Sequence, residues 1–170
     1  MDRVFYYYCR GIEAILAVAL SLMVIMVFGN VVLRYLFNSG IAFSEELSRW
    51  LFVWVTFLGA VVALHERGHL GTDFLTGRLP PAGKKLCLGV GYLLMLLTCW
   101  LLFKGALDQT KINWDVSAPS SGASVGIFYA SGIVFSVSAF VMLAVDLIKL
   151  VTGRVPEEEL IIVRESEEQA

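Results

Sequence analysis

Charged residues are scarce in this sequence: only 16% of its 170 residues are Asp, Glu, Lys or Arg, against roughly 25% in a soluble domain. There are only three cysteines, an odd number without paired spacing, so they provide neither a disulfide framework nor a metal-binding cluster. The few basic residues form no patch or stripe of the kind that binds nucleic acid. These absences exclude a disulfide-stapled domain and a nucleic-acid-binding protein.

The chain is instead rich in long apolar segments. Hydrophobic residues make up 58% of it, and the mean hydropathy is +0.75. Four windows approach or exceed the ~18 apolar residues that cross a bilayer. We therefore predict an all-α integral membrane protein with four transmembrane helices that are antiparallel neighbours. The predicted membrane domain is 12–153, with spans at about 12–33, 45–66, 86–107 and 125–150.

The segments outside the spans are assigned by composition. Tyrosine and lysine favour the edge of the membrane, so residues 1–11 are predicted to be interfacial. Apolar residues at helical spacing over 70–79 predict a short helix in the membrane plane. The run 117–124, rich in Ser and Gly, is expected to be a flexible loop, and the acidic tail, 154–170, to be disordered. The predicted interfacial anchors are Tyr6, Tyr7, Tyr8, Lys84 and Lys85.

Basic residues are distributed unevenly between the two sides of the predicted membrane domain. Nine of the 13 Lys and Arg residues fall before the first span, between the second and third, or after the fourth, and four fall on the other side. By the positive-inside rule, both termini are predicted to be cytoplasmic, and the 117–124 loop to face outward. No small-residue cleavage site follows the first apolar run, which predicts a retained span rather than a signal peptide.

The start of the second span has the most distinctive polar residues. Ser44 is predicted to cap the helix, and Glu45 and Glu46 lie in its first turn, where negative charge is favourable. Arg49 follows Glu45 at the i,i+4 spacing of an ion pair. In the first span, Asn30 is expected to hydrogen-bond to a neighbouring helix, since buried polar groups in a span tend to face protein.

Further along the second span, aromatic and small residues mark particular faces of the predicted helix. Trp50 and Trp54 are one turn apart, and Trp54 is too deep for an interfacial belt, which favours contact with protein. Gly59 and Ala63, also one turn apart, form a small face that allows another helix to approach closely.

In their order along the chain, these residues resemble the small membrane subunit of tripartite ATP-independent periplasmic (TRAP) transporters. The family pattern is an acid pair, a small residue, Arg, an aromatic-rich run ending in Trp, then Leu-Gly-Ala, and a His followed by Asp. The matching positions here are Glu45, Glu46, Ser48, Arg49, residues 51–54, residues 58–60, His69 and Asp73.

The resemblance implies a function in transport. TRAP transporters are described as secondary, typically sodium-coupled importers of bacterial and archaeal inner membranes, to which a periplasmic binding protein delivers an organic acid. The implied partners are that protein, the lipid bilayer and a large multi-span subunit that moves the substrate in elevator fashion. No cofactor and no catalytic residue is implied, and this chain is expected to brace the large subunit. The predicted partner interface comprises Glu45, Glu46, Arg49, Trp50, Trp54, Gly59, His69 and Asp73.

The same residues suggest other functions. His65-Glu66-x-x-His69 fits the H-E-x-x-H pattern of zinc proteases, but no third ligand is well placed, and Gly68 weakens the helix that the pattern needs. Both histidines fall at one helix end, so two axial ligands to one haem cannot come from this chain. A redox anchor completed by a partner chain, an ion or proton site at the acid pair, and an assembly factor remain open alternatives.

The sequence also lacks the features of a complete transporter. Transporters are usually built from repeats, with broken helices at the middle of the membrane. The four predicted spans carry no charge at mid-membrane and no proline-interrupted pair. This composition favours an accessory subunit independently of the resemblance.

Overall fold

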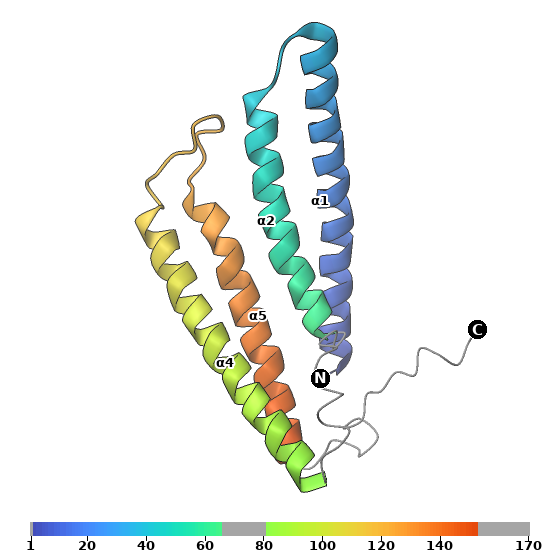
Figure 1. Cartoon of the computed structure of the whole chain (residues 1–170), viewed down its shortest axis with the longest axis vertical. Coiled ribbons are helices and arrows are strands. Elements are labelled where there is room, and N and C mark those ends of the chain that lie inside the picture. Colours follow the sequence, from blue (N-terminus) through green and yellow to red (C-terminus); the bar gives the residue numbers. More distant parts are fainter. Residues whose placement is uncertain (1, 66–80, 153–170) are drawn as a thin grey trace, which may run out of the picture.

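Four long helices account for most of the described chain (Figure 1). The structure, a computed structural model, describes residues 2–65 and 81–152. Each helix is long and apolar enough to cross a membrane, which confirms the predicted all-α fold with four spans. The predicted in-plane helix and the acidic tail lie outside the described residues. The helices are α1 (Asp2–Phe37), α2 (Ala42–His65), α4 (Pro81–Ile112) and α5 (Gly126–Val151).

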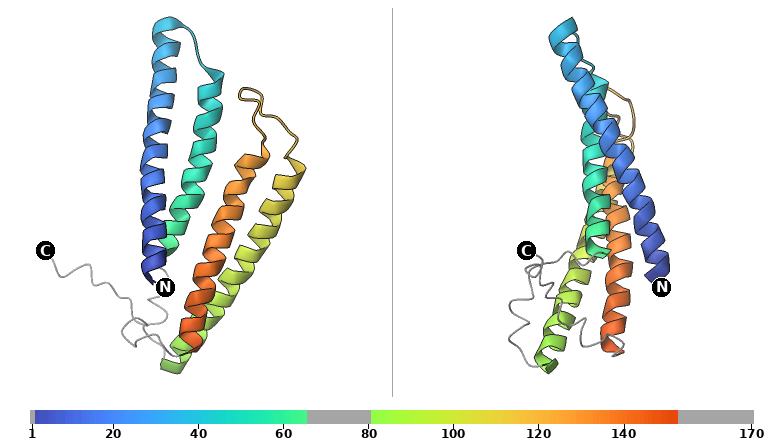
Figure 2. Two further views of the ribbon diagram at one scale, coloured as in Figure 1. Left: turned by 180° about the vertical axis from the view of Figure 1, so that it is seen from behind. Right: turned by 90° about the vertical axis from the view of Figure 1, so that its right-hand side faces the viewer.

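The helices form a row rather than a closed bundle. α1 packs against α2, α2 against α5, and α5 against α4, whereas α2 and α4 share no extensive contact within the described residues. Seen edge-on, the four helices overlap in a narrow layer (Figure 2). The pairs α1–α2 and α4–α5 are antiparallel hairpins (Figure 1).

Most of the apolar surface of this row faces outward. In the apolar window that marks each span, the buried share is 6% in α1 and α4, 17% in α2 and 22% in α5. α2 and α5 are therefore the centre of the row, and α1 and α4 are its edges. In a bilayer the outward surface meets lipid or a partner, because the described chain does not cover it.

The two edge helices are longer than a bilayer requires. α1 has 36 residues and α4 has 32. At a rise of 1.5 Å per residue these correspond to about 54 and 48 Å, against a hydrocarbon core of ~30 Å. Residues 2–11 form the first turns of α1, continuous with the first span. α4 continues past the uncharged run 86–103 and includes Lys104 and Lys111.

Small residues decide where the helices approach one another. A Cβ added at Gly132 of α5 would lie 3.1 Å from the Cβ of Ala106 in α4, so glycine allows this close contact. A Cβ at Gly59 of α2 would meet no atom within 4 Å. The small face predicted on α2 is therefore open rather than packed within the described chain. Buried residues form two clusters: Cys9, Ile12, Val61, Val62 and Met142, and Cys99, Ala139 and Leu143.

Candidate functional site

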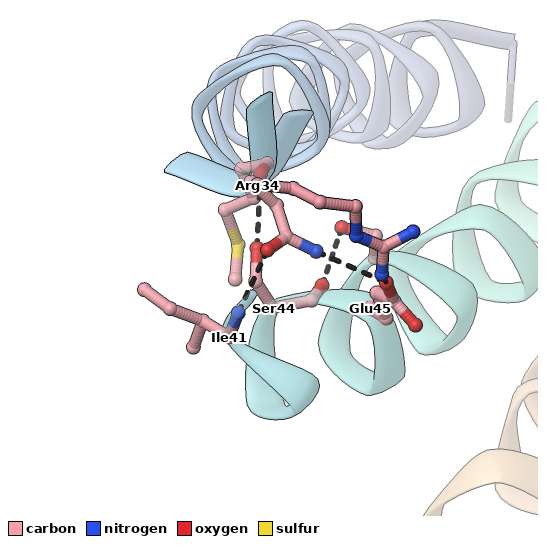
Figure 3. Close-up of polar contacts among 7 residues, drawn as sticks. Arg34, Ile41, Ser44 and Glu45 are labelled. Carbon is pink, nitrogen blue, oxygen red and sulfur yellow. Dashed lines mark hydrogen bonds and ion pairs between the residues drawn. The ribbon is translucent and has the colours of Figure 1, made fainter. Parts of the chain in front are cut away.

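The turn between α1 and α2 gathers polar side chains from both helices (Figure 3). The buried Asn30 accepts a hydrogen bond from the Ile41 N–H at 2.8 Å and donates one to Glu45 Oε1 at 3.2 Å. Arg34 Nη2 lies 2.5 Å from the same Glu45 oxygen. Asn30 thus satisfies a backbone donor of the turn and joins the two helices, which confirms the predicted hydrogen bond to a neighbouring helix.

Two local predictions for this turn are wrong. Glu45 forms its ion pair with Arg34, and no ion pair joins it to Arg49 in the described residues. The reason is that the end of α1 brings a cation to the carboxylate, which the spacing within α2 cannot show. Ser44 is not the cap: α2 begins at Ala42, and Ser44 Oγ donates to the carbonyl of Met26 at 2.9 Å. Both residues bind α2 to α1.

Glu46 faces the other hairpin and binds the α4–α5 loop. Its carboxylate accepts hydrogen bonds from the Ser120 N–H at 2.9 Å, from the Ser121 N–H at 3.2 Å and from the Ser121 hydroxyl. Figure 1 shows this loop reaching toward the start of α2. The two adjacent acids therefore make different connections. Glu45 joins α2 to α1 within one hairpin, and Glu46 connects that hairpin to the α4–α5 hairpin.

The run 117–124 is a folded turn, not the flexible loop predicted. Ser117 and Ser124 form an antiparallel bridge, and the Ala118 N–H donates to the Ala123 carbonyl at 2.8 Å. Gly122 has a φ of +68°, a conformation that glycine adopts readily and other residues rarely. Composition alone suggested flexibility, but in this setting the same Ser and Gly residues close a tight turn. Sequence reasoning therefore missed Ser120 and Ser121 as partners of Glu46.

Replacing Glu46 with glutamine is expected to loosen this loop. A neutral amide is a weaker acceptor than a carboxylate and has one acceptor oxygen instead of two. Hydrogen exchange followed by mass spectrometry should show faster exchange of the backbone amides in the peptide that covers 116–125.

The matched control for Glu46→Gln is Asp115→Asn, which removes the same charge from an exposed acid beside the loop. Asp115 forms no side-chain hydrogen bond or ion pair within the described residues, so exchange in the loop should not change. Equal exchange rates in Glu46→Gln and the unmodified protein would show that the loop stays closed without the carboxylate.

The other predicted interface residues of α2 divide into engaged and open positions. Trp50 packs edge-on against Phe128 of α5, with the ring centroids 6.4 Å apart, and Trp54 is half-buried. Arg49 is exposed, with no hydrogen bond or ion pair to any described residue. A Cβ at Gly59 would meet no atom within 4 Å, so this position is open. Arg49 and Gly59 are thus the predicted positions that α2 leaves available.

Several predicted residues lie at the opposite end of the helices. His65 is the last residue of α2, and its ring lies 6.4 Å from that of Phe5. The Tyr8 hydroxyl lies 2.8 Å from Ser138 Oγ of α5, so this predicted anchor also joins α1 to α5. Tyr6 and Tyr7 are exposed, and Lys84 and Lys85 lie near the start of α4. Outside the described residues lie Glu66, His69 and Asp73, and with them most of the H-E-x-x-H motif.

Comparison with known proteins identifies the family. Residues 23–153 match the family model described as tripartite ATP-independent periplasmic transporters, DctQ component. The chain belongs to this family. It is a small permease subunit of a TRAP transporter, a multi-pass membrane protein of a family that works with a large permease subunit.

Individual relatives agree with this assignment of a TRAP small permease. A TRAP transporter small permease protein of Haemophilus influenzae is 38% identical over 142 residues, which are 84% of this chain and 88% of that protein. The C4-dicarboxylate TRAP transporter small permease protein DctQ of Vibrio cholerae is 32% identical over 91 residues, 54% of this chain and 37% of that protein. The sialic acid TRAP transporter permease protein SiaT of Haemophilus influenzae is 28% identical over 122 residues, 71% of this chain but 20% of SiaT.

Proposed function

We propose that this TRAP small permease is a scaffold that braces the large subunit and does not itself carry the substrate or catalyse a reaction. The transporter imports an organic acid, delivered by a periplasmic binding protein, in a sodium-coupled step. The names of two relatives, which specify C4-dicarboxylates and sialic acid, support a carboxylate substrate. The chain lies in a bacterial or archaeal inner membrane with both termini in the cytoplasm.

The observation that carries this proposal is the single-row arrangement of apolar helices. A closed four-helix bundle would bury its own apolar stripes, whereas here the buried share of each span window does not exceed 22%. Two broad apolar faces remain for lipid and for a partner. An elevator mechanism moves one domain against a fixed frame, and a flat row of helices attached to that frame enlarges its footprint in the membrane.

The distribution of charge supports the absence of a substrate path within this chain. The runs 14–33, 50–64, 86–103 and 126–145 contain no acidic or basic side chain and no histidine. Charged residues in the described spans lie toward the helix ends, and the networks of Glu45 and Glu46 join elements of the chain to one another. Binding and moving a carboxylate would require polar groups along these runs.

A stripe along α2 is the best candidate for contact with the large subunit. We define the α2 stripe as positions that recur every three or four residues on the open side of the helix: Arg49, Phe52, Thr56, Gly59 and Ala63. Its small residues allow another helix to approach closely, and its cation can donate hydrogen bonds to that helix. This assignment keeps Arg49 and Gly59 in the partner interface. Glu45, Glu46 and Trp50 contact other parts of this chain and hold α2 in position.

The positions of the helix ends support the proposed topology. The start of α1 and the end of α5 lie at one end of the row, and the α1–α2 turn and the α4–α5 loop lie at the other (Figure 1). The described chain therefore has both of its termini on one side of the membrane. The excess of Lys and Arg on that side supports a cytoplasmic location for both ends.

Purification from native membranes tests the proposal. A tag on this chain, in mild detergent, should recover a much larger multi-span protein in stoichiometric amount. Gly59→Leu should lower that recovery at least several-fold, because a leucine on the α2 stripe keeps the partner helix at a distance. The chain alone should be unaffected, since the new side chain meets no atom of its own protein within 4 Å of the Cβ.

Two control variants make this result specific. Gly29→Leu places the same side chain on α1, also with no atom within 4 Å of the Cβ, and should leave recovery unchanged. His65→Ala should likewise preserve both recovery and uptake. Loss of function in His65→Ala, together with zinc bound to the purified chain, would refute the scaffold proposal and favour a zinc protease.

A further inference from the structure

An apolar groove runs along one side of α5, between α2 and α4. Its half nearer the α4–α5 loop has a volume of about 310 Å³, with walls that include Val53 and Phe57 of α2 and Leu102 and Ala106 of α4, and with Gly132 in its floor. The groove exists because α2 and α4 both pack on α5 and share no extensive contact with each other in the described chain.

The groove continues toward the other end of the helices. A second cavity of about 180 Å³ lies between the same three helices, with Leu64, Met95 and Phe135 in its walls and Ala139 in its floor. Leu102 lines both cavities, so they adjoin on the same side of α5. Together they extend along α5 from residue 128 to 143, which is roughly 22 Å at the helical rise.

The lining of this groove is mainly apolar. No charged residue lines either cavity, and the polar side chains are few. The half nearer the loop is open because three of its lining residues have no side chain longer than a methyl group: Gly105, Ala106 and Gly132. Such a lining suits a flexible hydrocarbon chain, which gains from burial of its surface without needing a fixed shape.

One cation lies at the end of the groove nearest the α4–α5 loop. Arg49 precedes Val53 and Phe57 at successive i,i+4 positions along one side of α2, so it lies one turn beyond the first groove residue. It is exposed and has no hydrogen bond or ion pair to any described residue. On α4, the amide-bearing Gln109 lines the groove at this same end.

We propose that this groove holds one anionic glycerophospholipid from the leaflet on the α4–α5 loop side. An acyl chain lies along α5 between α2 and α4, and the phosphate binds the Arg49 guanidinium. The charge pattern favours this occupant. The acid at this end, Glu46, is held by the loop through three hydrogen bonds, whereas Arg49 has no partner among the described residues. An apolar channel with such a cation at one end matches a molecule with an apolar chain and a single anion at one end. The guanidinium has five N–H donors, so Arg49 can bind the phosphate and still donate to a partner helix on the neighbouring α2 stripe.

Native mass spectrometry of the full chain tests the proposal. The protein is purified in mild detergent, stripped of lipid, and given phosphatidylglycerol or, as the comparison without a phosphate, diacylglycerol with the same acyl chains. The unmodified chain should retain one phosphatidylglycerol molecule and about tenfold less diacylglycerol, the ratio expected from one charge-assisted contact. Arg49→Gln should lower retention of phosphatidylglycerol to the level of diacylglycerol.

A second variant tests the groove itself. Gly105→Leu fills the half nearer the loop and should lower the retention of both lipids. The fold should be spared, because a Cβ at Gly105 meets no atom within 4 Å. Circular dichroism and elution volume check that the helices and the monodisperse state persist.

Matched controls separate a built site from the ordinary lipid annulus. Lys104→Gln removes a cation two residues from Leu102, which places it on the far side of α4 from the groove, and Gly29→Leu adds the same leucine on α1. Both should retain phosphatidylglycerol like the unmodified chain.

Equal retention in all variants would overturn the proposal in favour of annular lipid. Unchanged retention in Gly105→Leu with loss of the large subunit from native membranes would show that a partner helix occupies the groove instead.

Discussion

Replacing Asn30 with leucine is expected to destabilise the folded chain by about 1–2 kcal/mol, because two hydrogen bonds across the α1–α2 turn are lost. The Asn30 side chain accepts from the Ile41 N–H at 2.8 Å and donates to Glu45 at 3.2 Å, and it is 7% exposed. Leucine fills a similar volume but can make neither bond. The free energy of unfolding can be measured by titrating the protein in mixed micelles with a denaturing detergent.

The control for Asn30→Leu is Ser21→Leu, a polar-to-leucine change on the same helix. Ser21 is exposed, and its hydroxyl donates only to the Ala17 carbonyl one turn earlier, at 2.8 Å. Its replacement should change the stability by less than about 0.5 kcal/mol. If Asn30→Leu were as stable as Ser21→Leu, the α1–α2 turn would be held by apolar packing and not by its polar cluster.

Gly126→Ala is expected to cost about 1–3 kcal/mol, which is typical when a group is forced into a packed site. A Cβ at this position would lie 2.9 Å from Trp114 Cε3, 3.0 Å from the Thr110 carbonyl oxygen and 3.2 Å from Ser124 Oγ. The carbonyl belongs to the backbone of α4 and cannot rotate away. The start of α5 would have to move away from the end of α4, and the Gly126 N–H would lose its 3.0 Å hydrogen bond to the Asn113 carbonyl.

Gly105→Ala serves as the control for Gly126→Ala, since it adds the same methyl group to α4 where nothing lies within 4 Å. Its stability should be unchanged or slightly higher, because alanine favours a helix more than glycine does. Both variants are compared in the same detergent titration. Equal stability of the two would mean that the start of α5 and the end of α4 can move apart at little cost. The loop that Glu46 binds would then be too compliant for the proposed scaffold.

The two hairpins of this TRAP small permease are joined at both ends of the row. Near the termini, apolar packing of α1, α2 and α5 around Val61 and Met142 joins them. At the α4–α5 loop end, the carboxylate of Glu46 joins α2 to the loop through three hydrogen bonds. The row can therefore stay flat and open to lipid while its ends are fixed, which suits the proposed scaffold.

Much of this protein follows from its sequence. Four apolar windows of bilayer-spanning length predict four helices, because a helix pairs its backbone groups within one segment and unpaired groups are costly in lipid. The ordered motif from Glu45 to Asp73 sufficed to identify the TRAP family, which the family match and the relatives confirm. Asn30 was recognisable as a joint between helices because an amide within a span needs a protein partner.

Other features were decided by the tertiary structure alone. Spacing within α2 predicted Arg49 as the partner of Glu45, but α1 brings Arg34 beside that carboxylate, and Ser44 binds a carbonyl of α1 instead of capping its own helix. Composition predicted a flexible loop where Glu46 holds a closed turn. Sequence patterns register neighbours along one helix, whereas these contacts join segments that only packing brings together. The row order α1–α2–α5–α4, and with it the groove over α5, likewise depends on which small and apolar faces meet.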